Sequence, residues 1–328
     1  MFGYRGGGCC DRRDGSRLSR RALVRGAGAL AGGLALSPVL PRWGGAVEAS
    51  EVAAPAQQGS GVNVRWLGGG VVELATPDDQ QIAYVDAWVW GNTGWDRFGV
   101  QKPPEYASAA GFADYVRGRN PEAVFVLLTH DHPDHMGDYF ELLSALAGAG
   151  LNLKTVGQSD LMRSPTGLPP RFREAGFDPA QIVTNGGNGV NFGGRATHGS
   201  MQTWLVPAVH GNTLGFPAAG FILDIGGVRL YASGDTDLFG DMRLIGERYR
   251  PSVALLSAGD GAFTMDPRGA AMACQMVGVS QAIPIHYAHN GLVLGPQAGE
   301  DFRQALGELS PGTTAQVMTP NQSIMLNA

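Results

Sequence analysis

The feature that most constrains this chain is a short histidine-rich segment placed directly after an apolar run. Residues 124–128 read Val-Phe-Val-Leu-Leu, and the next seven residues read Thr-His-Asp-His-Pro-Asp-His. An uninterrupted apolar run of this length predicts a strand buried on both faces, as in a sheet covered by helices. Met136, Phe140, Leu143 and Ala147 follow at helical spacing and predict a helix over 133–147. The segment is therefore expected between a core strand and a helix.

Three further polar residues lie at the ends of other expected strands. His210 follows a strand at 203–209, Asp235 follows one at 228–232, and His286 follows one at 282–285. Ligands delivered from strand ends converge on one rigid cavity. Imidazole nitrogens and carboxylate oxygens without thiolates suit zinc, manganese, iron or cobalt. The sequence therefore predicts a centre for two metal ions, built from His130, His132, Asp134, His135, His210, Asp235 and His286.

The remaining pattern predicts a layered α/β domain. Short β-rich runs at 62–67, 71–75 and 82–86 precede the histidine segment, and Gly226-Gly227 predicts a tight hairpin between two later strands. Asp266-Pro267 is a favourable helix start, with an N-capping carboxylate followed by proline. Strand-rich halves with helices between them are typical of a layered α/β fold.

These residues together resemble the metal signature of the metallo-β-lactamase superfamily. The match consists of His130-x-His132-x-Asp134-His135 followed by His210, Asp235 and His286. Segments 216–222, 230–236, 263–267 and 284–287 resemble the branch that contains ascorbate-6-phosphate lactonase. The resemblance implies a four-layer αββα sandwich, the metallo-β-lactamase fold, over residues 61–328, with a dinuclear site at one edge.

The resemblance also implies a role for each ligand. His130, His132 and His210 would hold the first ion, Asp134, His135 and His286 the second, and Asp235 would bridge them. Asp134 would also be catalytic, orienting a metal-bound hydroxide and accepting its proton. The implied function is hydrolysis of an ester, lactone, amide or phosphodiester with two divalent ions, zinc being expected first and manganese or iron as alternatives. An iron-dependent oxidoreductase or persulfide dioxygenase, and a non-catalytic metal-binding protein, remain as alternatives.

Aromatic residues are concentrated in the connection over 87–120. Seven aromatic side chains lie there, and they predict either core packing or an apolar wall beside the metals. We expect Trp88, Trp90 and Trp95 to contact substrate, because loops at strand ends carry such contacts. His289, three residues after His286, is expected as a substrate contact or proton shuttle, with surface placement as the alternative. His198 is expected in a turn and Cys274 as a buried apolar filler.

The first 49 residues predict a targeting segment. They hold eight arginines and three acids, and Arg20-Arg21 precedes a Gly/Ala-rich apolar stretch that is too short to span a membrane. This arrangement resembles a twin-arginine signal and predicts export to the periplasm or the exterior, followed by a linker at 50–60. After cleavage no stable membrane insertion is expected. The net charge of −10 over residues 50–328 argues against nucleic acid and leaves a small molecule as the expected substrate.

Overall fold

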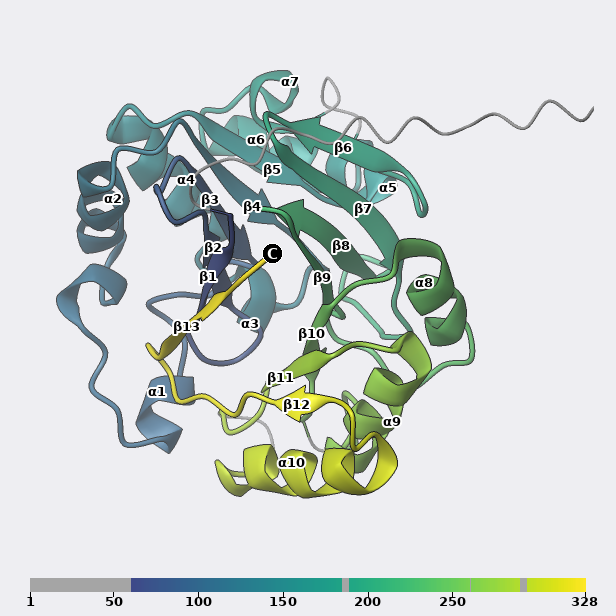
Figure 1. Ribbon diagram of the computed structural model, residues 1–328. Coiled ribbons are helices and arrows are strands. Elements are labelled where there is room, and N and C mark those ends of the chain that lie inside the picture. The colour runs from purple at the N-terminus through teal and green to yellow at the C-terminus, as the bar shows by residue number, and fades with distance from the viewer. Residues whose placement is uncertain (1–59, 185–188, 260, 290–293) are drawn as a thin grey trace, which may run out of the picture. The chain divides into compact units, whose positions relative to one another are not determined.

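The computed structural model describes residues 60–184, 189–259, 261–289 and 294–328 (Figure 1). The expected signal segment at 1–49 and all but the last residue of the expected linker at 50–60 lie outside these ranges. Among the described residues, no helix combines the length and the apolar character needed to cross a membrane.

The first sheet carries the strand that precedes the histidine segment. Its order is β13-β1-β2-β3-β4-β5. Neighbouring strands are antiparallel from β13 to β3, whereas β3, β4 and β5 run parallel. The bounds are β1 (Val62–Trp66), β2 (Val72–Ala75), β3 (Gln81–Val85), β4 (Ala123–Leu127), β5 (Leu153–Val156) and β13 (Ser323–Leu326).

The second sheet has the order β12-β11-β10-β9-β8-β7-β6. Strands β9 to β12 are parallel, and β6 to β9 are antiparallel. The expected Gly226-Gly227 hairpin joins β8 to β9, and both glycines have the positive φ that such a turn requires. The bounds are β6 (Arg195–His198), β7 (Met201–Pro207), β8 (Ala219–Ile225), β9 (Val228–Ala232), β10 (Val253–Ser257), β11 (Gln281–Ile285) and β12 (Thr314–Ala315).

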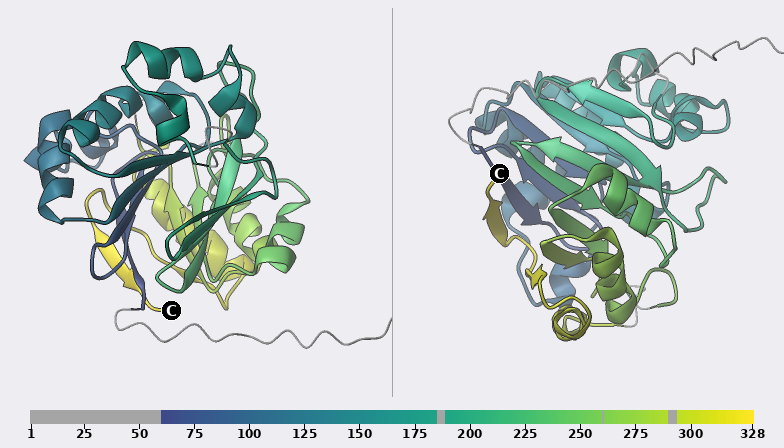
Figure 2. Two further views of the ribbon diagram at one scale, coloured as in Figure 1. Left: turned by 90° about the horizontal axis from the view of Figure 1, so that it is seen from above. Right: turned by 45° about the vertical axis from the view of Figure 1, so that its right-hand side comes forward.

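Helices cover the outer face of each sheet, as Figures 1 and 2 show. The helices are α1 (Gly94–Arg97), the 3₁₀ turn η1 (Pro104–Tyr106), α2 (Ala109–Gly118), α3 (Pro133–Met136), α4 (Tyr139–Gly148), α5 (Ser159–Arg163), α6 (Pro169–Glu174), α7 (Pro179–Ile182), α8 (Met242–Tyr249), α9 (Pro267–Val277) and α10 (Gln297–Leu309). Helices α2 and α4 pack on the first sheet, and α8, α9 and α10 pack on the second. The four-layer αββα sandwich expected from the sequence is therefore confirmed.

The side chains of β4 explain why that strand is uninterruptedly apolar. Phe125 and Leu127 lie in the core between the two sheets, and Val124 and Val126 lie in the core beneath the outer helices. Because successive side chains of a strand point to opposite faces, a strand between two cores needs apolar residues throughout. The expected burial of β4 on both faces is correct.

Two expected boundaries differ from the structure. The helix expected over 133–147 is divided into α3 and α4, because the backbone N–H of Asp138 donates to the carbonyl of Ala87 instead of continuing the helix. Strand β7 ends at Pro207, which has no N–H for the ladder, so His210 lies on the following loop.

The start of α9 is as expected, with the carboxylate of Asp266 accepting from the N–H of Gly269. Cys274 is fully buried on that helix, also as expected.

Candidate metal centre

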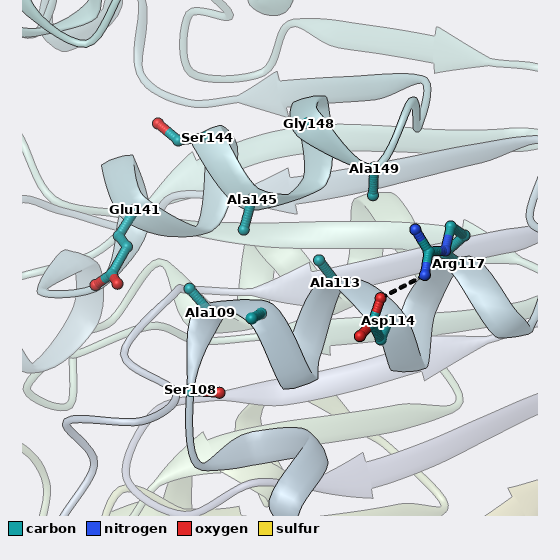
Figure 3. A pocket seen from close by; sticks show the side chains of 11 residues that line it. Ser108, Ala109, Ala113, Asp114, Arg117, Glu141, Ser144, Ala145, Gly148 and Ala149 are labelled. Atoms are coloured by element: carbon teal, nitrogen blue, oxygen red, sulfur yellow. Dashed lines mark hydrogen bonds and ion pairs between the residues drawn. The ribbon is translucent and has the colours of Figure 1, made fainter.

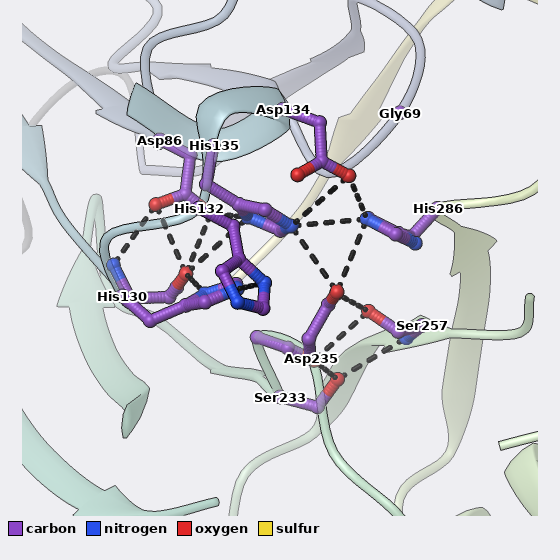
Figure 4. A network of polar contacts seen from close by, with 12 residues as sticks. Gly69, Asp86, His130, His132, Asp134, His135, Ser233, Asp235, Ser257 and His286 are labelled. Carbon is purple, nitrogen blue, oxygen red and sulfur yellow. Dashed lines mark hydrogen bonds and ion pairs between the residues drawn. The ribbon is translucent and has the colours of Figure 1, made fainter. Parts of the chain in front are cut away.

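The predicted metal ligands lie at one edge of the two sheets. The loop after β4 carries the histidine segment, the loops after β7 and β9 carry His210 and Asp235, and the turn after β11 carries His286. Parallel strands present their carboxyl ends at the same edge of a sheet, so these side chains converge. Figure 4 shows the histidine segment, Asp235 and His286 directed toward one another.

A first group contains three imidazoles. His130 Nε2 lies 3.0 Å from His132 Nδ1, which lies 3.3 Å from His210 Nε2. His130 is buried, and the other two rings are half-buried. Burial lowers the pKa of His130 well below its usual value, and the neighbouring His135 adds to this effect. His130 is therefore neutral, which is the form of histidine that binds metals.

A second group surrounds the carboxylate of Asp235. Its Oδ2 lies 3.2 Å from the Nε2 atoms of both His135 and His286, and these two nitrogens are 3.0 Å apart. Asp134 Oδ2 lies 3.5 Å from His286 Nε2. Burial by itself raises the pKa of Asp235, but the imidazoles of His286 and His135 outweigh burial and hold it well below its usual value. Asp235 is therefore a buried anion that needs cationic partners.

Asp235 also reaches the first group. The same Oδ2 lies 3.8 Å from His210 Nε2. One buried carboxylate oxygen therefore stands between the two sets of nitrogens, and this is the residue to which the resemblance assigns a bridging role.

The arrangement fits divalent metal ions. A zinc ion binds nitrogen and oxygen at about 2.0–2.2 Å, so neighbouring ligand atoms around one ion are separated by about 3–4 Å. The nitrogen and oxygen separations in both groups, from 3.0 to 3.8 Å, lie in that range. Two sets of candidate ligands are His130, His132, His210 and His130, His135, Asp235.

Three residues without a sequence-assigned role hold the ligands in place. Asp86 Oδ2 lies 2.7 Å from His135 Nδ1, and the hydroxyl of Thr129 lies 3.0 Å from His130 Nδ1. Ser257 donates a hydrogen bond of 3.1 Å from its hydroxyl to Asp235 Oδ1. Each contact uses the atom that faces away from the centre, which orients the other nitrogen or oxygen toward it.

A glycine loop lies directly against the ligands. A Cβ on Gly70 would lie 2.8 Å from Cε1 of His135 and 3.2 Å from Cδ2 of His286, so this position requires glycine. The carbonyl of neighbouring Gly69 accepts a hydrogen bond of 2.8 Å from the backbone N–H of His286. The loop after β1 therefore fixes the backbone of a candidate ligand from the opposite sheet.

Of the three tryptophans expected to contact substrate, one lies beside the candidate metal centre and the other two pack against other aromatic rings. Trp95 is 1% exposed and packs against Tyr106, so its ring lies in the core, as the packing alternative for this aromatic connection expects. Trp90 is half-buried, packs against Phe112 and donates from Nε1 to Glu141. Trp88 lies beside the centre, with its ring edge-on to His289 at a centroid distance of 5.7 Å.

Neither the surface position considered for His289 nor the turn position expected for His198 is found in the structure. His289 is buried, so the alternative of a surface position is excluded. Its Nε2 lies 3.9 Å from Asp134 Oδ2. His198 ends strand β6 and packs against Phe125.

A hollow of about 650 Å³ lies elsewhere, between α2 and α4 (Figure 3). Small and polar side chains line it, including Ala109, Ala113, Ser144 and Ala145. None of the predicted site residues is among the described residues that line this hollow.

Comparisons with known proteins agree with this geometry. The family described as the beta-lactamase superfamily domain matches residues 87–287. A UPF0173 metal-dependent hydrolase of Archaeoglobus fulgidus is 35% identical over 222 residues, which cover 65% of this chain and 86% of the relative. One of Chloroflexus aurantiacus is 34% identical over 276 residues, which cover 81% of this chain and 98% of the relative.

A solved structure has the same fold. The metallo hydrolase Igni18 of Ignicoccus hospitalis superimposes with a TM-score of 0.62 at 24% identity, covering 82% of this chain and all of that one. The family match and the relatives establish the family independently of this likeness in fold. The chain belongs to the metallo-β-lactamase superfamily and is a metal-dependent hydrolase of the UPF0173 family.

Proposed function

We propose that this protein hydrolyses an ester, lactone, amide or phosphodiester bond in a small molecule with the help of two divalent ions. The observation that carries the proposal is the position of Asp235, whose Oδ2 lies 3.2 Å from His135 and His286 and 3.8 Å from His210. A carboxylate between two sets of nitrogens suits two cations, because its negative charge reduces their mutual repulsion.

The ligand sets follow from this position. His130, His132 and His210 would hold the first ion, and Asp134, His135 and His286 the second, with Asp235 shared. When bound, the ions supply a water molecule of lowered pKa and polarise the substrate oxygen. Nitrogen and oxygen donors without sulfur suit zinc, which we propose as the native metal, with manganese or iron as the alternatives to be tested.

Asp134 is proposed as the catalytic carboxylate. Burial by itself raises its pKa, but hydrogen bonding to His286 and the charge of His135 outweigh burial and lower it. Asp134 is therefore an anion at neutral pH, and its side chain is 31% exposed, unlike that of Asp235. An ionised carboxylate at the open side of the centre can accept a hydrogen bond from the attacking water and orient it toward the substrate.

A lactone is the first substrate class to test. The segments around Asp235 and His286 resemble the branch that contains ascorbate-6-phosphate lactonase, and a lactone carbonyl needs the same polarisation as an ester. The assay therefore combines chromogenic esters, a series of lactones and a phosphodiester with measurement of the bound metal.

Three variants test the mechanism. Asp235→Ala is expected to weaken both metal positions, His286→Ala to empty mainly the second, and Asp134→Asn to slow hydrolysis even where metal remains. The loss of water activation costs several kcal/mol of barrier, at about 1.4 kcal/mol per tenfold in rate. Asp237→Ala is the matched control, because this nearby carboxylate is exposed.

Two outcomes would contradict the proposal. Two tightly bound ions and a near-normal rate in Asp235→Ala would exclude a bridging role. Bound iron together with oxygen consumption would favour the oxidoreductase alternative over hydrolysis.

A further inference from the structure

The turn after β11 brings a second imidazole back toward the centre. His286 and Ala288 both have left-handed backbone conformations, with φ of 57° and 55°. Such conformations are costly for residues other than glycine and persist only where the surroundings impose them. In this turn the ring of His289 lies perpendicular to that of His286, with centroids 4.7 Å apart.

The two rings share one carboxylate oxygen. Asp134 Oδ2 lies 3.5 Å from His286 Nε2 and 3.9 Å from His289 Nε2. Candidate ligand atoms of these three residues all lie within 4.8 Å of one another. Neighbouring ligand atoms around one ion with bonds of about 2.1 Å are about 3–4 Å apart, so the separations from Asp134 Oδ2 match a shared ion.

The surroundings of His289 hold its ring at this position. The side chain is 3% exposed, and the ring of Trp88 meets it edge-on, with an interplanar angle of 76°. A ring held in place by packing presents Nε2 to Asp134 in one orientation, as a metal ligand requires.

We propose that His289 is an additional ligand of the second metal position. This inference rests on the proposed dinuclear centre and adds one donor to it. The second position would then have five donors, from Asp134, His135, His286, His289 and the shared Asp235, against four for the first.

The test measures metal binding in His289→Gln and His289→Ala. Purified proteins are loaded with Co²⁺, whose visible absorption reports the number and type of ligands, and are then titrated with a competing chelator. Loss of the imidazole is expected to weaken the second ion at least tenfold and to change its absorption, with the first ion retained. His198→Gln is the matched control, because it removes an imidazole on strand β6. Trp88→Phe tests whether altered packing on His289 is enough to change the affinity and the absorption.

The outcomes are distinguishable. If both His289 variants bind two ions with unchanged affinity and absorption, the ligand role is overturned, and a change confined to kcat or KM would instead assign His289 to the substrate. If the unaltered protein binds fewer than two ions, the dinuclear centre itself fails. Thermal unfolding of the metal-free variants shows whether each is folded before loading.

Discussion

Asp86 Oδ2 lies 2.7 Å from Nδ1 of His135, and both side chains are buried. The same carboxylate accepts hydrogen bonds from the backbone N–H and the hydroxyl of Thr129, which in turn contacts His130. One carboxylate therefore positions a candidate ligand from each metal group. A carboxylate acceptor beside Nδ1 favours a proton on that nitrogen, and Nε2 is directed toward His286.

Replacing Asp86 by Asn is expected to weaken metal binding without removing any ligand. The neutral amide holds the imidazole less firmly in the ligating tautomer, and loss of such a supporting contact reduces affinity about 10- to 100-fold. Competition with a chelator measures this change. Asp224→Asn serves as the control, since its carboxylate pairs with Arg229 at a partly exposed site. Equal affinity of both variants for metal would show that Asp86 does not support the centre.

The convergence of the candidate ligands is predictable because it depends on local sequence and strand order. A strand buried on both faces places the residues after it at the sheet edge, and this applies to His130 and Asp134 as well as to Asp235. Such reasoning needs no knowledge of side-chain packing. The order of apolar runs and helices predicts a layered α/β domain, and the four αββα layers are what the resemblance to the metallo-β-lactamase superfamily implies.

The supporting contacts were not predictable because they depend on packing between distant segments. Asp86 precedes His135 by 49 residues, and only the parallel pairing of β3 with β4 brings them together. The burial of Trp95 depends on packing in the same way. Its position in a loop-rich connection suggests exposure, but helix α1 turns the ring into the core.

Trp88 is expected to influence substrate choice. Its half-buried ring lies at the edge of the centre against His289, where it can contact an apolar part of a substrate. Trp88→Ala should lower kcat/KM for substrates with an apolar group about tenfold more than for those without one, which corresponds to about 1.4 kcal/mol. Trp95→Phe should reduce thermal stability and leave the profile unchanged. A profile that Trp88→Ala does not alter would make Trp88 a packing residue.

His198 is expected to make the protein less stable in mild acid. Burial lowers its pKa to about 4, and the charge of Lys154 acts in the same direction. An unfolded histidine has a pKa of about 6.5, so between pH 6.5 and 4 the unfolded chain binds the proton more readily. The free energy of unfolding therefore falls as pH falls through this window, and the contribution of His198 is complete above it.

Urea unfolding at pH 7.5, 6.0 and 5.0 measures this dependence in metal-free protein. His198→Gln should lose less stability between pH 7.5 and 5.0 than the unaltered chain, because glutamine does not titrate. The comparison cancels the contributions of other groups. Parallel curves for the two proteins would contradict the assignment.

We propose export of the folded, metal-loaded protein by the twin-arginine route. Arg20-Arg21 and the weakly apolar stretch that follows motivate this proposal. Folding before export lets the ligands meet their metal inside the cell. Changing both arginines to lysine should trap uncleaved precursor in the cytoplasm, as measured by cell fractionation. Normal export of the double variant would exclude this route.

A buried charge network on the helix-covered face of the first sheet shares no residue with the candidate metal centre. Glu73 on β2 is 1% exposed and accepts hydrogen bonds from Tyr84 and Arg119, at 2.7 and 2.8 Å, and from Tyr115 at 3.2 Å. Arg119 follows helix α2 and also pairs with Asp79. The network therefore attaches the end of α2 to the sheet through one carboxylate.

Removing this charge is expected to destabilise the fold without changing metal binding. Among the described ion pairs, Glu73→Gln removes the counter-charge of Arg65 and leaves the guanidinium of Arg119 with Asp79. Loss of one partner of a buried pair costs about 3 kcal/mol. The matched control is Asp114→Asn, since the pair of Asp114 with Arg117 is exposed and should cost less than about 1 kcal/mol. Urea unfolding gives both free energies, and metal content shows whether the centre is intact. If the two variants lost similar free energies of unfolding, the buried ion pairs of Glu73 would stabilise the fold no more than the exposed pair of Asp114.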